Sequence, residues 1–345
     1  MNLEKLYFQI EEKIKTLDFA KIWPGFKVLK YALFDQDKCF FDGKYIAKTA
    51  EFCANTSINY HGEQIATWMI DEDIDINILT SKMVHEMFHG FQTINNWACW
   101  PNEVEALFKY RYHEENLALK LKENQLLVKL VRHFNVDDFE EMLALKHTRM
   151  EKYPYEFSYE SKTEEIEGAA NFVEWQVLNA LDKNMAEKLS LKMQTEITNP
   201  AAFFTIRLIN YYTGALLFKV LSDAKEDFFN EKERPVIFGL IEHQKGANPL
   251  LDDALLSKVK KSLDQYNAET KAIIDDALAK NALVKEGLFK LMGLNIYDAR
   301  FYNNYLTTTY FLAYLEDDTP QTIFGDYIIH MFDEKTIDKI YRWER

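Results

Sequence analysis

Two histidines and a glutamate give the sequence its clearest chemical pattern. His85, Glu86 and His89 form an HExxH motif inside Met83–Gly90, an apolar stretch of helical character. Residues i and i+4 of a helix leave the same face, so both imidazoles can reach one metal ion. Glu86 follows His85 directly, close enough to hold and deprotonate a water at that metal. Imidazole ligands with an open position for water favour zinc.

A catalytic zinc usually takes three protein ligands, so a third is expected elsewhere in the chain. The metzincin motif would supply another histidine shortly after His89, but Gly90–Asn95 contains none. A carboxylate on another helix is therefore expected. Without such a ligand, the two histidines would only satisfy polar contacts in a helix that packs in the core.

Two acidic segments compete for the role of third ligand. One contains Glu103, close to the motif, and the other contains Glu160, Glu164 and Glu167. The i, i+4, i+7 spacing of the second set predicts that its three carboxylates share one helical face. Such a face would be electrostatically strained without a cation, although a solvated helix face is the alternative. Gly168 and the alanines after it predict a smooth side that the HExxH helix can approach closely.

The HExxH motif followed by a distant Glu167-Gly168-x-Ala170, with Phe172 and Glu174 beyond it, resembles the gluzincins, the thermolysin-like metallopeptidases. The resemblance covers residues 64–181. It implies a zincin-like fold in which Glu86 is the general base and the zinc ligands are His85, His89 and Glu167.

The spacing departs from the best-known gluzincin pattern. The 77 residues from 90 to 166 separate His89 from Glu167, so a helical insertion must lie between the two ligand helices. This departure leaves Glu164 and Glu103 as alternative third ligands. The resemblance also implies that the strand Gln64–Ile70 forms the sheet edge along the cleft, where an extended peptide can add by main-chain hydrogen bonds. An ordinary strand is the other interpretation of this segment.

A further donor is expected to stabilise the oxyanion of a tetrahedral intermediate. Tyr211 lies in an apolar helix, and its hydroxyl could fill this role. Core packing is the alternative interpretation of Tyr211. His243 and His330 could also donate, but nothing in their surroundings distinguishes either of them.

Composition restricts the class of protein. The 345 residues carry a formal charge of −14 and no basic run, which argues against nucleic acid as a partner. Three cysteines without a CxxC pattern indicate free thiols in a reducing compartment. Charged residues near the N-terminus interrupt any signal-peptide pattern, and no apolar run reaches the ~20 residues of a membrane helix. We therefore expect no membrane association and a cytoplasmic location.

Apolar periodicity predicts an α+β fold, zincin-like by resemblance and mainly helical. We expect 1–80 to hold an N-terminal helix and a small β-sheet of the catalytic domain, 81–300 to form the helical catalytic body with the zinc site, and 301–345 to form a C-terminal β-hairpin segment. Thr80 or Ser81 is expected to cap the HExxH helix. Further helices are predicted at 102–121, 123–134, 137–149, 159–181, 201–221, 234–244, 252–266, 268–283 and 285–292.

These patterns together predict a zinc-dependent metallopeptidase that hydrolyses peptide bonds by means of a metal-activated water. Its partner would be a peptide or protein substrate. The motif defines the metal chemistry without defining the substrate. A zinc hydrolase of a non-peptide amide or ester, and a zincin-like binding protein without catalytic activity, are therefore the alternative functions.

Overall fold

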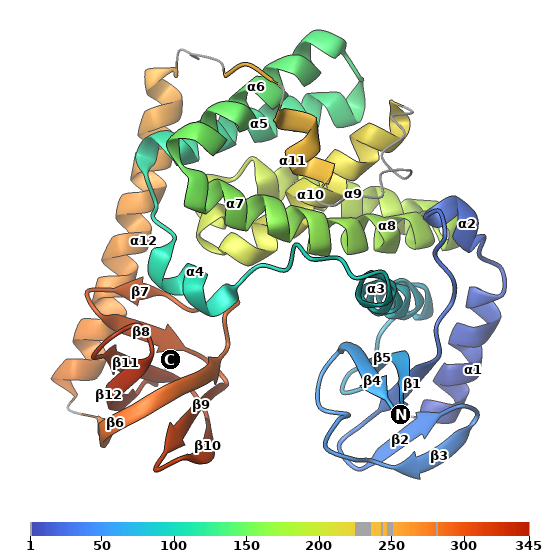
Figure 1. The fold of residues 1–345 in the computed structure, drawn as a ribbon, viewed down its shortest axis with the longest axis horizontal. Helices are drawn as coiled ribbons and strands as arrows, with labels where there is room; N and C mark the ends of the chain where they lie inside the picture. Colours follow the sequence, from blue (N-terminus) through green and yellow to red (C-terminus); the bar gives the residue numbers. More distant parts are fainter. Residues whose placement is uncertain (1, 225–235, 243, 247–250, 281, 345) are drawn as a thin grey trace.

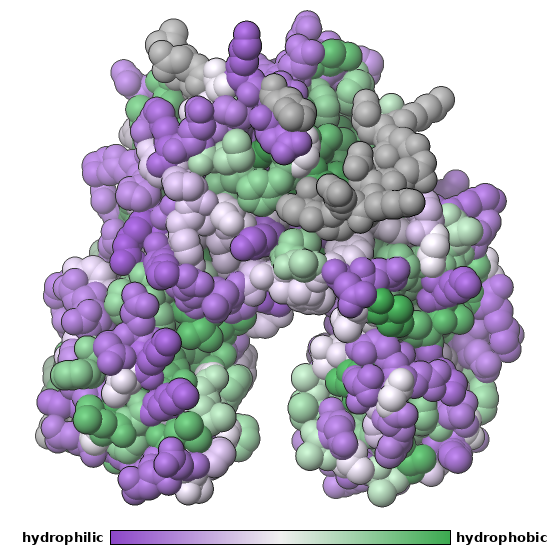
Figure 2. Space-filling view, viewed as in Figure 1, coloured by the Kyte–Doolittle hydropathy of each residue, from purple (hydrophilic) through white to green (hydrophobic). Residues whose placement is uncertain are grey.

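The computed structural model describes residues 2–224, 236–242, 244–246, 251–280 and 282–344. A body of packed helices carries a small N-terminal sheet on one side and a larger C-terminal sheet on the other (Figure 1). The space-filling view shows the molecule hollowed between these two lobes, below the helices (Figure 2). The predicted mixed α+β architecture is therefore confirmed. His243 lies outside the described residues, and so do residues 247–249 of Lys245–Pro249, the segment of the sequence that best suggests a domain boundary.

The N-terminal lobe joins α1 (Leu3–Ile14) and the short α2 (Phe19–Ile22) to a five-stranded sheet of order β3-β2-β1-β5-β4. Its strands are β1 (Tyr31–Phe34), β2 (Lys38–Phe41), β3 (Lys44–Ala47), β4 (Thr56–Tyr60) and β5 (Glu63–Met69). β5 pairs parallel with β1 and antiparallel with β4. The prediction that Gln64–Ile70 forms the sheet edge is therefore wrong, because β4, a strand that was not predicted, takes that place.

The HExxH motif lies on α3 (Ile76–Ile94), which packs against the N-terminal sheet. Asp75 caps this helix, since its Oδ1 accepts hydrogen bonds from the backbone N–H groups of Asn77 at 2.8 Å and Ile78 at 3.3 Å. The prediction that Thr80 or Ser81 is the cap is wrong. Both residues are buried inside the helix, where their hydroxyls donate to backbone carbonyls one turn earlier.

The helical body also differs in detail from the predicted helices. A break at 110–113 divides the predicted helix 102–121, whereas the two helices predicted between 252 and 283 are one helix, α12. None of the described helices is long and apolar enough to cross a membrane. The body contains α4 (Glu103–Lys109), α5 (Glu114–Arg132), α6 (Val136–Lys152), α7 (Pro154–Thr163), α8 (Ala169–Leu181), α9 (Lys183–Ile197), α10 (Ile206–Asp223), α11 (Val236–Ile241), α12 (Asp253–Ala279) and the 3₁₀ turn η2 (Pro200–Phe204).

The C-terminal lobe is a seven-stranded antiparallel sheet of order β10-β9-β6-β12-β11-β8-β7, larger than the predicted hairpin. The helix predicted at 285–292 is wrong, because this segment lies within strand β6. There Phe289 and Leu291 turn toward the lobe's core while Leu288 and Met292 are exposed, an alternation with the period of a strand. The strands are β6 (Leu283–Leu294), β7 (Phe301–Tyr302), β8 (Tyr305–Thr308), β9 (Phe311–Glu316), β10 (Thr319–Phe324), β11 (Tyr327–Met331) and β12 (Thr336–Arg342).

A single π-helical turn, η1 (Glu164–Gly168), joins α7 to α8. Because π turns bond i to i+5, the residues after η1 are rotated relative to α-helical spacing. Glu160 and Glu164, which lie at or before the start of η1, face buried cations, with Lys120 Nζ 2.8 Å from Glu160 and Lys146 Nζ 3.1 Å from Glu164, whereas Glu167 faces the histidines. The prediction that Glu160, Glu164 and Glu167 share one face is therefore wrong.

Gly168 and Gly214 allow η1 and α10 to touch. A Cβ on Gly168 would lie 2.5 Å from Gly214 Cα, and a Cβ on Gly214 would lie 2.6 Å from the Glu164 carbonyl oxygen. Gly168 itself therefore faces α10, while α8, which begins with Ala169 and Ala170, packs against the HExxH helix α3 as expected. This close backbone approach fixes where η1 lies, and with it the position of Glu167.

Replacing Gly214 by Ala is expected to destabilise the protein by about 1–3 kcal/mol, because neither backbone can give way to the new methyl group. Urea unfolding measures the effect. Gly239→Ala is the matched control, since a Cβ there meets nothing within 4 Å. An equal loss of stability in both variants would contradict the close approach.

Candidate metal centre

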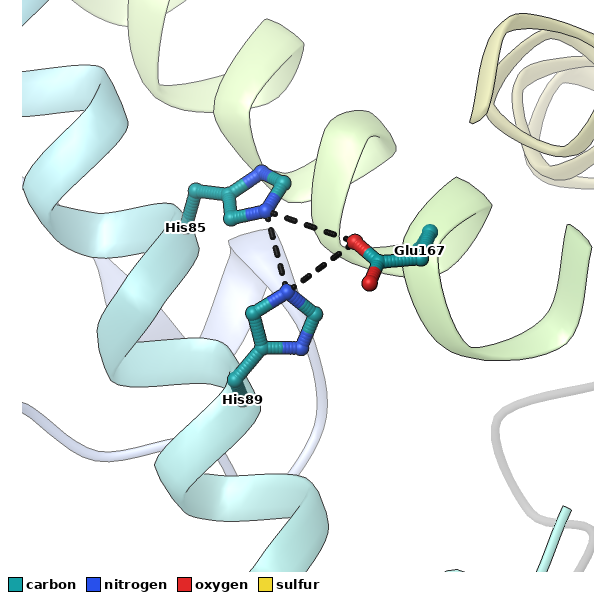
Figure 3. Close-up of side chains that lie close together, drawn as sticks. All are labelled: His85, His89 and Glu167. Carbon is teal, nitrogen blue, oxygen red and sulfur yellow. Dashed lines mark hydrogen bonds and ion pairs between the residues drawn. The ribbon is translucent and has the colours of Figure 1, made fainter. Parts of the chain in front are cut away.

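Three potential ligand atoms from two separate elements converge between α3 and η1. His85 and His89 project from α3 toward Glu167, as the close-up shows (Figure 3). The two histidine Nε2 atoms are 3.0 Å apart, and Glu167 Oε2 lies 3.2 Å from that of His89 and 3.9 Å from that of His85. Among the described residues this is a group of three whose ligand atoms all lie within 4.8 Å of one another.

Gln92 connects the two elements that carry these ligands. Its Nε2 donates to the Ile166 carbonyl oxygen in η1 at 2.8 Å, and its Oε1 lies 2.7 Å from Nδ1 of His89. Because the amide nitrogen must face the carbonyl, the amide oxygen must face His89. Nδ1 of His89 therefore carries a proton, and Nε2 is the atom that can bind a metal once its own proton has left.

Glu174 of α8 places an acceptor beside Nδ1 of His85, as Gln92 does for His89. Its buried carboxylate lies 3.2 Å from His85 Nδ1 and 3.5 Å from Lys82 Nζ. Burial favours the neutral acid, but His85 and Lys82 outweigh it and lower the pKa of Glu174. A carboxylate behind a metal-binding histidine commonly fixes the imidazole with Nε2 toward the metal.

The donor set fits a metal cation. An acceptor lies beside Nδ1 of each histidine, and both Nε2 atoms and a Glu167 oxygen point into one small volume. These groups repel one another unless a positive charge lies between them. Two imidazole nitrogens and one carboxylate oxygen are a set that suits divalent transition metals.

Arg207 of α10 leaves one oxygen of Glu167 free for a metal. Its Nη2 donates to Glu167 Oε1 at 2.7 Å, so Oε2 alone faces the histidines. The same guanidinium donates through Nη1 to Glu103 and through Nε, at 2.7 Å, to the Tyr211 hydroxyl. Burial opposes ionisation of Glu167, but the neighbouring histidines and Arg207 lower the pKa of this carboxyl to about 2.

The two alternative third ligands bind protein partners instead. Glu103 binds Arg207 and accepts a hydrogen bond from the Tyr159 hydroxyl at 2.6 Å. Glu164 accepts from Thr213 at 2.7 Å and pairs with Lys146. Neither belongs to the group formed by the two histidines and Glu167.

The group borders a cavity of about 340 Å³, within the range typical of small-molecule sites. Glu86 and Tyr211 line the same cavity, so the predicted base and the predicted donor both lie beside the ligands. Trp68 of β5 and Tyr297 of the C-terminal lobe contribute to its walls. His330, by contrast, lies on β11 with Nδ1 2.6 Å from Asp338 and is not part of this cavity.

Several residues around the centre were not predicted from the sequence. Gln92 follows His89 by three positions, so helical spacing alone would have placed both on one face. Arg207 precedes Tyr211 by four positions in the same way, but its contact with Glu167 depends on packing between α10 and η1. Tyr297 carries no local signal, because it reaches the cavity only through the docking of the C-terminal lobe.

Comparisons of the chain with protein-family models, curated proteins and solved structures found no match.

Replacing Gln92 by Leu is expected to lower zinc affinity by about 10- to 100-fold, because His89 loses the acceptor that orients it. Competition with a chromophoric chelator measures the affinity. Gln194→Leu is the matched control, a buried glutamine that bonds Ser190 and Arg132 instead. Equal affinities in both variants would show that Gln92 does not support the site.

Zinc affinity is also expected to rise with pH. Burial disfavours the imidazolium of His89, but the Glu167 carboxylate outweighs it and raises the pKa of His89 to about 9 in the metal-free protein. The metal needs the neutral imidazole, so below pH 9 its binding displaces this proton and affinity should increase about tenfold per pH unit. Calorimetry in two buffers of different ionisation enthalpy measures the proton release. Affinity independent of pH between 6.5 and 8.5 would contradict the coupling.

Proposed function

We propose that this protein is a zinc-dependent metallopeptidase of the gluzincin type. The observation that carries the proposal is the convergence of His85, His89 and Glu167 in a cavity that Glu86 also lines. The HExxH sequence and the glutamate from a second helix agree with the gluzincin resemblance. The long separation of the two ligand elements is accounted for by α4–α7, which lie between α3 and η1 in the chain.

The proposed chemistry divides between the metal and the residues of the chain. His85, His89 and Glu167 would hold a zinc ion, which supplies a Lewis acid that polarises a carbonyl group and activates water. Glu86 acts as the general base, taking a proton from the attacking water and passing it to the leaving amine. Arg207 donates to the Tyr211 oxygen, and the phenol proton of Tyr211 would turn to the oxyanion of the intermediate. Burial, with the charge of Glu167 adding to it, raises the pKa of Tyr211, so this hydroxyl remains a donor at neutral pH.

The position of the cavity favours a peptide over a small molecule. Its walls include Thr56 beside the edge of the N-terminal sheet and Tyr297 from the C-terminal lobe. The hollow between the two lobes is open over a long stretch (Figure 2). An extended chain could lie in this hollow and pass the candidate metal centre.

Replacing Glu86 by Gln tests the mechanism. The variant should still bind zinc, since Glu86 is not a ligand, while kcat for quenched fluorescent peptides should fall by at least about 100-fold. Glu72→Gln, an exposed position before α3, is the control. A Glu86→Gln enzyme with full activity would remove Glu86 from the mechanism.

Unblocked aminoacyl amides and simple esters are tested as substrates beside the quenched fluorescent peptides. Cleavage of these compounds alone, with peptides left intact, would replace the peptidase proposal by hydrolysis of a small amide or ester. Zinc binding with no turnover of any member would indicate a binding protein.

A further inference from the structure

Six charged side chains lie buried together inside the helical body, on the side of η1 away from the histidines. None of them is more than 2% exposed, and they come from α5, α6, α7 and η1. None belongs to the group formed by the two histidines and Glu167. The cations and anions of this buried charge network balance one another: Lys120, Lys146 and Arg149 face Glu123, Glu160 and Glu164.

Lys146 is the residue through which the network reaches η1. Arg149 of α6 pairs with Glu123 of α5 and Glu160 of α7. Lys146, one turn earlier on α6, lies 2.7 Å from Glu123 Oε1 and 3.1 Å from Glu164 Oε2. Burial opposes the charge of Lys146, but the two carboxylates outweigh it and raise its pKa, so Lys146 is a cation in the folded protein.

The first residue of η1 is held from two sides. Besides its pair with Lys146, Glu164 accepts a hydrogen bond from Thr213 Oγ1 of α10 at 2.7 Å. The backbone of Glu164 is also confined, since a Cβ on Gly214 would lie 2.6 Å from its carbonyl oxygen. Three residues later in the same turn, Glu167 presents Oε2 to the histidines. A shift of Glu164 would therefore move the third ligand.

The π turn decides which way Glu167 faces. With α-helical spacing, Glu167 would lie on the face of Glu160 and Glu164, toward the buried cations. The wider π turn brings Glu167 out of that face and toward His89. Because π turns are rare, contacts outside the helix are expected to hold this one against the α-helical arrangement.

A network of charges suits this task better than an apolar contact does. Buried ion pairs contribute little net stability, because desolvation offsets most of their attraction, and apolar side chains of similar volume often pack as well. Their geometry is specific, however, since Lys146 must face both Glu123 and Glu164. Few arrangements of α5, α6 and η1 satisfy this condition, so the network fixes a position more than it adds stability.

We propose that Lys146 and Glu164 are positioning residues of the metal centre. Their buried pair holds η1 as a π turn and thereby keeps Glu167 Oε2 beside the two histidines. Both residues act through Glu167. This inference rests on the zinc site of the proposed function, and it is independent of the substrate.

Two substitutions within the network separate positioning from stability. Glu164→Gln and Glu123→Gln each remove one buried carboxylate partner of Lys146, so both should lower the stability that urea unfolding measures. In Glu123→Gln, Lys146 keeps its pair with Glu164 and η1 stays held. Glu164→Gln should therefore weaken zinc binding by about 10- to 100-fold in competition with a chromophoric chelator, whereas Glu123→Gln should bind zinc like the wild type.

The visible absorption spectrum of Co²⁺ bound in place of zinc is a readout that a loss of stability alone does not change. Its bands depend on the ligands and their geometry. The spectrum of Glu164→Gln should depart from that of the wild type in the same direction as the spectrum of Glu167→Gln, which lacks the carboxylate ligand. The spectrum of Glu123→Gln should match the wild type.

A milder variant keeps the test decisive if Glu164→Gln does not fold. Thr213→Val removes only the hydroxyl that donates to Glu164, and it should weaken zinc binding at least about threefold. Thr270→Val is the matched control, because this buried hydroxyl donates to the Tyr266 carbonyl oxygen within α12. Its zinc affinity should equal that of the wild type.

The outcomes distinguish this inference from the proposed function. Equal zinc affinities and equal Co²⁺ spectra in Glu164→Gln and Glu123→Gln, or in Thr213→Val and Thr270→Val, would overturn the positioning role while leaving the zinc site intact. A wild-type protein that binds neither Zn²⁺ nor Co²⁺ would overturn the proposed function and this inference with it.

Discussion

The contact between α3 and the π turn η1 is the constraint on which the site depends. The helix supplies two imidazoles and the turn supplies one carboxylate, so neither element forms the centre alone. Gln92 joins them by bonding His89 on one side and the Ile166 carbonyl on the other. Arg207 holds the outer oxygen of Glu167, and Gly214 allows the turn to lie against α10. Each contact therefore acts on the position of one carboxylate oxygen relative to two ring nitrogens.

The N-terminal and C-terminal lobes both contribute to the surroundings of this centre. α3 lies against the N-terminal sheet, and a Cβ on Gly90 would lie 2.5 Å from Leu29 Cδ1, which indicates how closely the helix approaches that lobe. The C-terminal lobe contributes Tyr297 from the opposite side. The cavity walls thus come from segments more than 200 residues apart in the chain, and the ligands lie where the two lobes meet the helical body.

Local sequence patterns were sufficient to predict part of this arrangement. The spacing of His85 and His89 places them on one helical face without any tertiary information. The choice of Glu167 over Glu164 and Glu103 agrees with the structure, in which only the Glu167 carboxylate lies beside both histidines. The π turn was not predictable from Glu164–Gly168, because α-helical spacing assigns Glu160, Glu164 and Glu167 to one face. β6 was mistaken for a helix because a strand with one exposed apolar side lacks a clear polar alternation. β4 and Tyr297 depend on long-range pairing and docking, which short-range periodicity does not report.

A crystallographic anomalous difference map recorded at the zinc absorption edge tests the central claim most directly. The arrangement of side chains predicts one strong peak bound by Nε2 of His85, Nε2 of His89 and Oε2 of Glu167, with Arg207 still on the other oxygen of Glu167. A peak at Glu103 or Glu164, or no peak between the two histidines in zinc-soaked crystals, would contradict it.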